Sequence, residues 1–327
     1  MGFRFTAKTL FFCLVWALAA VPAAHAVDYG PSRAKIFLVA GSSQNANFAQ
    51  EVLDQRAMWL RQGFAPEEIA CYYVEPDRAD FLDDASQWKY LKSELQDCYP
   101  ASVQLLRRHL RAAAYSSNPP DFIYLFVTSH GQRPISARMQ AHERDDEDYR
   151  NLRAWARYPV MDDYIMAVEG DAQGRAQLKD LARDMDSGTR SDELFLTPRS
   201  VQGFLAQYFP DTPKFLVFQG CYSGGFLKDP RKDRKRDSLR ELEQVTVLTA
   251  ANYDRTSFGC DPGDNTTFFG GAFNELLAGY IGNPLTMDWK NLYRAVKNRI
   301  SALEEQYEDL RPSEPLYFSN YKKKSGD

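Results

Sequence analysis

Short apolar runs alternate along the chain with stretches of helical spacing. The clearest apolar runs cover residues 35–41, 122–127, 214–218 and 245–251. An unbroken apolar strand is typical of a sheet buried on both faces, whereas a sheet with one face in water shows alternating polar residues. Strands of this kind, alternating with helices, predict an α/β fold in which helices cover both faces of a mostly parallel sheet.

Helices are expected where apolar residues recur at three- and four-residue spacing. This spacing predicts helices over residues 47–62, 102–114, 197–208, 267–280 and 288–306. Further strands are expected at 69–74, 164–168 and 316–318, the last at a sheet edge. The polar stretch 78–100 shows no clear period, so we expect it to be irregular.

Residues 1–26 have the parts of a secretory signal peptide. Two basic residues precede an apolar stretch from Leu10 to Ala20, and the segment ends in Ala24-His25-Ala26. That small-x-small ending is what signal peptidase recognises. The apolar stretch is shorter than the roughly 20 residues needed to span a bilayer. We therefore expect cleavage after Ala26 and export, either to a periplasm or out of the cell.

The chain that would remain, 27–327, is mildly acidic. The full sequence has 40 basic and 44 acidic residues. Two of the basic residues lie in the leader, which leaves 38 in the mature chain and a net charge of −6. A nucleic-acid partner is therefore not expected, because such proteins carry a clustered basic surface. No second apolar run resembles a membrane span, so we expect none in the mature protein. The sequence does not indicate an oligomeric state.

The length suits a single α/β domain over 27–327. Residues 132–195 are highly charged and poor in glycine, which predicts an insertion into that domain. A second charge run, 228–243, is expected to be a solvated loop leading into a helix, with proteolytic processing as the alternative. His109 and His142 lie among charged residues, and we expect both to be exposed.

Cysteine is sparse after the leader. The four positions are Cys71, Cys98, Cys221 and Cys260. They are too few for a disulfide scaffold, and none forms a CxxC pair. With only three histidines besides, we expect no structural zinc site, no other metal and no cofactor. If Cys221 stays a free thiol, one disulfide at most is available. Cys71–Cys98 is the preferred pair, because both lie in the N-terminal third.

Two chemically useful residues directly follow buried strands. His130 comes after the run 122–127, and Cys221 after the run 214–218. Parallel sheets place their binding sites beyond the carboxyl ends of the strands, so adjacent strands would bring the two residues together. An imidazole beside a thiol can take its proton and later protonate a leaving amine. The backbone N–H groups of Gly131 and Cys221 could hold the oxyanion that forms in between.

Four blocks of the chain resemble a known group of proteins. FIYLFVTSHG at 122–131 and FLVFQGCYSGG at 215–225 resemble the His-Gly and Cys blocks of the caspases, gingipains and legumains. FLVAGSSQNAN at 37–47 and VTVLTAANYDRTSFGC at 245–260 resemble legumain in particular. The four blocks stand in the family's order over most of 35–280. The resemblance implies a caspase-like three-layer α/β sandwich and a legumain-like cysteine peptidase.

The resemblance also implies roles for single residues. His130 would be the base and Cys221 the nucleophile, with Gly131 in the oxyanion hole. Asn47 matches an asparagine that helps to orient the histidine in legumain, and an ordinary turn asparagine is the alternative. Thr256 and Ser257 match a pair of serines that line the pocket for the residue before the scissile bond.

The match fails at the charged positions of that pocket. Legumain carries an arginine and two acidic residues there, and this chain has Ala49, Tyr222 and Gly271 at the matching positions. We therefore expect a preference for an uncharged residue before the scissile bond, since a charged side chain would be buried without a partner.

The function predicted from these residues is cleavage of peptide or protein substrates through a thioester on Cys221. A transpeptidase that uses the same dyad is one alternative, because the two enzymes differ only in whether water or an amine accepts the acyl group. A catalytically silent binding protein on the same fold is the other.

Overall fold

The structure is a computed structural model. It describes residues 32–42, 46–75, 78, 85–139, 153, 155–168, 185–188, 195–230, 238–259 and 265–323. The predicted leader at 1–26 lies outside these ranges, as do His142, Cys260, residues 231–237 of the charge run and much of the insertion predicted at 132–195.

The described chain forms one large sheet with the strand order β10-β9-β8-β4-β1-β2-β3. All neighbouring strands are parallel except β10, which runs antiparallel to β9 at the edge. The strands are β1 (Ile36–Ala40), β2 (Ile69–Tyr73), β3 (Tyr99–Pro100), β4 (Ile123–Thr128), β8 (Lys214–Gln219), β9 (Val245–Thr249) and β10 (Leu316–Ser319). The predicted mostly parallel sheet is confirmed, and so is the predicted edge strand.

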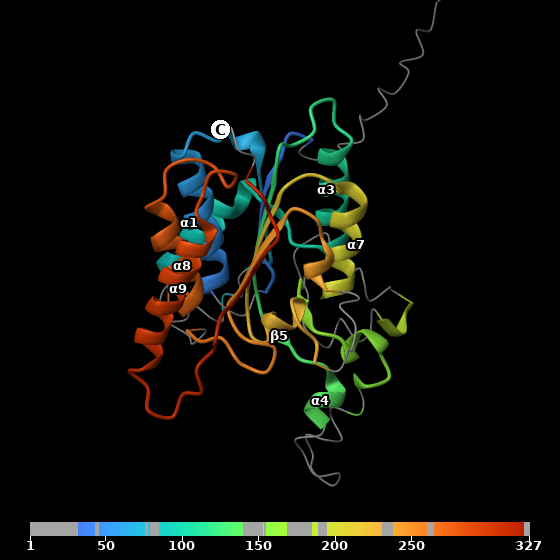
Figure 1. Ribbon diagram of the computed structural model, residues 1–327, viewed down its shortest axis with the longest axis vertical. Helices are drawn as coiled ribbons and strands as arrows, with labels where there is room; N and C mark the ends of the chain where they lie inside the picture. The colour runs from blue at the N-terminus through green and yellow to red at the C-terminus, as the bar shows by residue number, and fades with distance from the viewer. Residues whose placement is uncertain are drawn as a thin grey trace, which may run out of the picture.

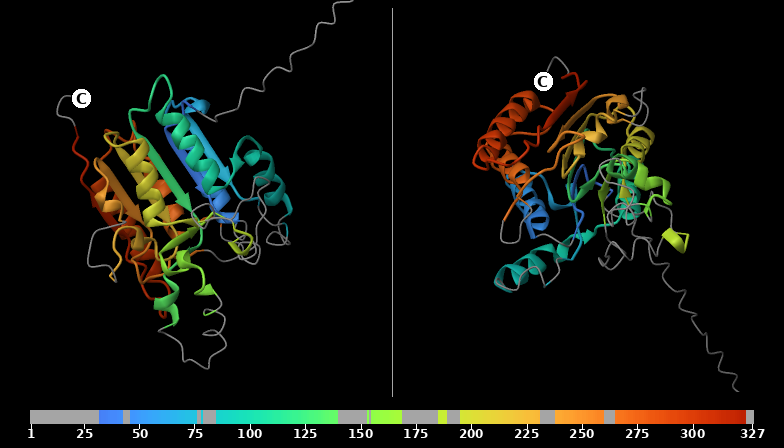
Figure 2. Two further views of the ribbon diagram at one scale, coloured as in Figure 1. Left: turned by 90° about the vertical axis from the view of Figure 1, so that its right-hand side faces the viewer. Right: turned by 90° about the horizontal axis from the view of Figure 1, so that it is seen from below.

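Helices cover both faces of this sheet (Figure 1). On one face lie α1 (Ala46–Arg61), α8 (Phe268–Ala278) and α9 (Trp289–Glu304), and α2 (Ala85–Glu94) contacts α1. On the other face lie α3 (Val103–Ala114) and α7 (Pro198–Tyr208), which stand in front of the sheet in the left view of Figure 2. The three-layer α/β sandwich expected from the alternating pattern is therefore confirmed.

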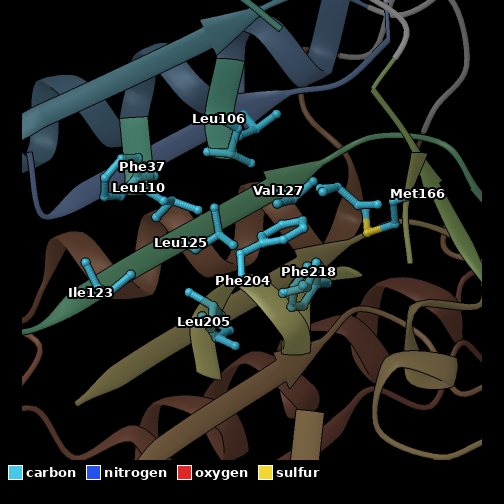
Figure 3. Packing of buried hydrophobic residues seen from close by; sticks show 14 of the residues in the cluster. Phe37, Leu106, Leu110, Ile123, Leu125, Val127, Met166, Phe204, Leu205 and Phe218 are labelled. Carbon is cyan, nitrogen blue, oxygen red and sulfur yellow. The ribbon is translucent and has the colours of Figure 1, made fainter. Parts of the chain in front are cut away.

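The central strands are buried on both sides because successive residues face opposite layers. In β4, Ile123, Leu125 and Val127 belong to the core under α3 and α7, whereas Tyr124 and Phe126 belong to the core under α1, α8 and α9. Figure 3 shows the first of these cores, with Phe204 and Leu205 of α7 against the strands. This double burial explains the unbroken apolar runs.

A smaller antiparallel sheet follows the carboxyl end of β4. It has the order β5-β6-β7, with β5 (Gly131–Gln132), β6 (Ile165–Ala167) and β7 (Phe195–Leu196). A short helix, α4 (Ile135–Met139), follows β5. The strand predicted at 164–168 is confirmed. The two-residue strands β5 and β7 are too short to give a period in the sequence.

Single turns of 3-10 helix complete the described secondary structure. They lie at Pro66–Glu68, Leu95–Asp97, Pro159–Asp162, Ser223–Phe226 and Leu239–Glu241. In the described part of the chain, no helix is both long and apolar enough to cross a membrane.

Two sequence expectations are wrong. The stretch 78–100 is not irregular throughout, because α2 and its 3-10 extension occupy 85–97 and bury Leu91 and Leu95 against the core. His109 is buried rather than exposed, since its helix turns the ring toward β2 and β3, where Nδ1 lies 2.8 Å from the Tyr72 hydroxyl. The first error comes from a helix that buries few apolar residues, and the second from the position of His109 three residues after Leu106 on the buried face of α3.

Lys214, the first residue of β8, is fully buried at the amino end of the sheet. Its ammonium group donates to the carbonyl oxygens of Pro210 (3.3 Å), Thr212 (2.7 Å) and Glu243 (2.9 Å). An ammonium has three protons, so each can be used. Burial lowers the pKa of Lys214 to about 8, against the raising effect of nearby acidic groups.

Cys71 and Cys98 form a disulfide between β2 and the segment that leads into β3. Both residues are buried, and both belong to the core under α1, α8 and α9. The preferred pairing is confirmed, and Cys221 is a free cysteine, as the prediction required.

Candidate active site

His130 and Cys221 follow two adjacent parallel strands. In the β4–β8 register, Thr128 lies opposite Gln219, and the Ser129 N–H donates to the Gln219 carbonyl at 3.1 Å. The chain therefore reaches His130 and Cys221 side by side at the carboxyl edge of the sheet. The main chains stay in contact beyond the strands, where glycines at positions 131 and 220 allow the close approach. A Cβ at position 131 would lie 1.9 Å from the Cys221 carbonyl oxygen.

The thiol of Cys221 lies against the backbone of Ser257. The Ser257 N–H donates to Sγ at 3.4 Å, and Sγ lies 3.6 Å from the Ser257 carbonyl oxygen. Burial raises the pKa of the Cys221 thiol, and the backbone N–H groups of Ser257 and of Cys221 itself oppose that shift. In this arrangement the sulfur is protonated at neutral pH.

His130 is also largely shielded from water. Its ring meets the edge of Phe48 from α1, with the ring centroids 5.2 Å apart. Burial lowers the pKa of His130, so the imidazole is neutral at neutral pH. Its Nε2 atom is buried and has no hydrogen-bond partner within the described chain. The resting pair is therefore a thiol and a neutral imidazole rather than an ion pair, and the imidazole has a free nitrogen for a proton.

The nucleophile stands in a tight turn. Tyr222 has a positive φ of 57°, and its N–H donates to the Arg255 carbonyl at 2.8 Å. The backbone of residues 255–257 thus runs beside residues 221–222. The guanidinium group of Arg133, just beyond β5, lies 5.7 Å from the centre of the Tyr222 ring. Residues from β5 and from the segment after β9 therefore flank the thiol.

Asn47 is brought close to the site without a recorded contact to the histidine. Its side-chain N–H donates to the Gly259 carbonyl at 2.6 Å, which ties the first turn of α1 to the segment after β9. Its neighbour Phe48 is the residue that contacts His130. An orienting role for Asn47 stays a prediction, and the contacts suggest that it would act through the position of α1.

The proposed pocket residues fall into two groups. Ser257 touches the thiol, Tyr222 follows it, and Thr256 is half-buried beside them. Ala49 instead faces the core under α1, and Gly271 lines an open pocket of about 340 Å³ between α1 and α8. The surroundings of Ala49 and Gly271 therefore differ from those of the thiol.

Sequence reasoning missed a buried polar cluster behind the dyad. Its members are Glu51 of α1, Thr128 at the end of β4, Gln219 at the end of β8 and Thr267, which caps α8. A signal was present, since Thr128 and Gln219 are polar residues that end otherwise apolar strands. Nothing in the sequence indicates that Glu51, 77 positions before Thr128, is their partner.

Among the described residues, no group of three or more His, Cys, Asp and Glu side chains is placed to hold a metal ion.

Comparison with known proteins gives only structural neighbours. No family model matches the chain, and no curated protein matches it. Among similar solved structures, caspase-1 from Spodoptera frugiperda is 10% identical, with 88% of this chain and 87% of that chain covered and a TM-score of 0.43. Protein GSU0716 from Geobacter sulfurreducens is 10% identical, with 88% and 93% covered and a TM-score of 0.46. The case for a function therefore rests on the geometry of the site.

Proposed function

We propose that the protein is a cysteine peptidase in which Cys221 is the nucleophile and His130 the general base. The observation that supports this proposal is the junction of β4 and β8, where the backbone of Gly131 packs against that of Cys221, so that a neutral imidazole and a free thiol follow two adjacent strand ends. The free Nε2 of His130 and the N–H groups near the thiol supply the remaining parts of an acyl-transfer site.

The reaction would follow from the resting state of the pair. His130 takes the thiol proton as the sulfur attacks the peptide carbonyl, and the N–H groups of Gly131 and Cys221 bind the resulting oxyanion. The intermediate collapses, the amine leaves with the proton from His130, and the acyl group stays on sulfur as a thioester. Water then gives a proton to His130, attacks the thioester and releases the acid, and the sulfur recovers the proton.

Cleavage of a diverse peptide pool, read by mass spectrometry, tests this function. We expect the purified protein to cut peptides and the variants Cys221→Ala and His130→Ala to lose at least about 1,000-fold in kcat/KM. Lys290→Met, an exposed change on α9, is the matched control and should keep full activity. Equal cleavage by wild type and Cys221→Ala would contradict the proposal.

We also propose that the enzyme is a legumain-like peptidase that prefers an uncharged residue before the scissile bond. Tyr222, Thr256 and Ser257 are uncharged and lie around the thiol. Peptides that differ only at that residue should show the preference in kcat/KM. A strong preference for Asp would contradict it and would point to Arg133, which lies over Tyr222. A strong preference for Arg would contradict it as well.

Export is the third part of the proposal. The disulfide between Cys71 and Cys98 supports it, because disulfides persist mainly in oxidising compartments outside the cytosol. N-terminal sequencing of the protein from the periplasm or medium of a secreting host should give Val27 as the first residue. A cytosolic product that keeps residues 1–26 would contradict it.

A further inference from the structure

Glu51 is a carboxyl group sealed directly behind the dyad. Its side chain is fully buried, as are those of Thr128, Gln219 and Thr267 to within 1%. Thr128 is two residues before His130, and Gln219 is two residues before Cys221. Phe48 of α1 contacts the His130 ring, and Glu51 lies on the same helix, so the histidine and the Glu51 cluster are on the same side of the sheet.

Two helices, α1 and α8, and one strand, β4, meet at this carboxyl group. The Thr267 N–H and hydroxyl each donate to Oε1 at 2.7 Å, which fixes the start of α8. The other oxygen, Oε2, lies 2.5 Å from the Thr128 hydroxyl. Gly270 completes the fit, since a Cβ there would lie 2.0 Å from the Glu51 carboxyl carbon. Glu51 therefore joins α1 and α8 to the end of β4.

The protons around Thr128 do not match the acceptors. The Thr128 hydroxyl lies 2.5 Å from Glu51 Oε2 and 2.8 Å from Gln219 Oε1. A hydroxyl has one proton, so it cannot donate to both. The Gln219 Nε2 atom, meanwhile, is buried without a hydrogen-bond partner in the described chain.

Two arrangements resolve this mismatch. If Glu51 is protonated, its O–H donates to Thr128, and Thr128 donates to Gln219 Oε1. If Glu51 is ionised, Thr128 donates to the carboxylate, and the Gln219 amide turns so that Nε2 donates to Thr128. The second arrangement gives Gln219 Nε2 a hydrogen-bond partner. It also places Nε2 where Oε1 stands in the first arrangement, at the end of β8.

We propose that Glu51 is a positioning residue for the dyad, and that its proton selects between these two arrangements and so couples the reactivity of Cys221 to pH. The effect on catalysis rests on the peptidase function proposed above, whereas the effect on thiol reactivity does not.

The charge environment agrees with a switch in the neutral range. Burial raises the pKa of Glu51 to about 7, against the lowering effect of its bonds to Thr128 and Thr267. The groups that face it from β4, β8 and α8 are the uncharged Thr128, Gln219 and Thr267. The charged group that acts on it within the described chain is Asp54, one turn along α1, which raises the pKa further.

The rate at which iodoacetamide alkylates Cys221 is a direct test. The rate is followed between pH 5.5 and 9 by the mass of the peptide that contains Cys221, which separates it from Cys260. We expect a step in the wild-type profile near pH 7, of about 2- to 10-fold, which is the size of one hydrogen bond gained or lost. Burial lowers the pKa of His130 from 6.5 and raises that of the Cys221 thiol from 9.0, and these two separate ionisations should remain in all the variants below.

Matched variants test whether the step near pH 7 arises from Glu51. Glu51→Gln keeps the shape and holds the neutral arrangement, so the step should vanish. Asp54→Asn, a half-buried carboxyl on the same helix, should keep it. Thr128→Ser retains the hydroxyl and should also keep the step, whereas Thr128→Val should lose it. This serine and valine pair decides the matter even if Glu51→Gln does not fold.

The outcomes separate the two proposals. A wild-type profile without a step near pH 7, or a step that persists in Glu51→Gln or Thr128→Val, overturns the role of Glu51. A step that behaves as expected in a protein that cleaves no peptide supports Glu51 and counts against the peptidase function instead.

Discussion

Strand β8 has a buried polar group at each end, and the two groups are satisfied differently. At the amino end, Lys214 has three protons and three carbonyl acceptors. At the carboxyl end, Thr128 has one proton for two acceptors, and Gln219 Nε2 has no partner among the described residues. The matched end can adopt one arrangement, and the mismatched end can adopt two.

This difference shows where the molecule is built for stability and where for chemistry. Parallel sheets carry their sites at the carboxyl ends of the strands, and the mismatched cluster lies on that side, behind Cys221. The carboxyl end also holds the unpartnered Nε2 of His130. Buried polar groups without partners cost free energy, so the two at the carboxyl ends of β4 and β8, Nε2 of His130 and Nε2 of Gln219, are the ones for which we expect a functional reason.

The largest expected effect comes from removing the matched group. Lys214→Met removes three hydrogen bonds from a buried ammonium group, at about 1 kcal/mol each, and should lower the free energy of unfolding by about 3 kcal/mol. Urea unfolding measures this, with Lys290→Met on the surface of α9 as the control within about 0.5 kcal/mol. The pH step in the alkylation of Cys221 should be unchanged. A loss of that step in Lys214→Met would contradict the conclusion that the two ends of β8 act independently.

The two ends should also give stability slopes of opposite sign. Glu51 has a pKa of about 7 in the fold against the ordinary 4.5, so the fold holds its proton more tightly. The contribution of Glu51 to stability is therefore largest below pH 4.5 and falls by about 3 kcal/mol as the pH rises to 7. Lys214 has a pKa of about 8 against 10.5, so stability should rise again between these values. Urea midpoints across pH, in wild type, Glu51→Gln and Lys214→Met, test each slope.

A pair of glycine substitutions sharpens the comparison further. Gly270→Ala places a methyl group against the Glu51 carboxyl and should lower the free energy of unfolding by about 2 kcal/mol. It should also abolish the pH step in the alkylation of Cys221. Gly203 lies in α7 with no atom within 4 Å of an added Cβ. Gly203→Ala should therefore stabilise the protein by about 0.5–1 kcal/mol. Thermal unfolding of both variants gives the answer, and equal effects would contradict the close fit at Gly270.

The smallest expected effect concerns His130. The imidazole must be neutral to take the thiol proton, and burial lowers its pKa, so kcat/KM should fall on acidification with a midpoint below 6.5. Phe48→Leu admits water to the ring edge and should move that midpoint upward by a few tenths of a pH unit. A midpoint above 6.5 in the wild type would contradict the burial of the ring as the main influence.

The sheet was predictable because its signal is local. Each central strand touches two apolar layers, so the runs that end before His130 and Cys221 could be identified without any partner in view. α2 was not predictable, because it buries few apolar side chains, Leu91 among them, and its remaining positions are polar. The two-residue strands β5 and β7 depend wholly on pairing with β6.

The site was predictable only in part for the same reason. His130, Gly131 and Cys221 lie within strand-end motifs, and the parallel register places them together. Glu51 acts through partners that lie 77 and 216 positions away, and those separations carry no sequence pattern. The positions of Ala49 and Gly271 came from the resemblance alone, and their helices direct them elsewhere.

The disulfide between Cys71 and Cys98 has a practical consequence for any experiment on this protein. In the proposed function Cys221 works only as a reduced thiol, while the cross-link between Cys71 and Cys98 has to stay oxidised. A strong reductant that rescues an oxidised nucleophile would thus also threaten the fold over time. The bridge is buried and the thiol is partly accessible, so a weak, brief reductant should regenerate one sulfur while sparing the other two.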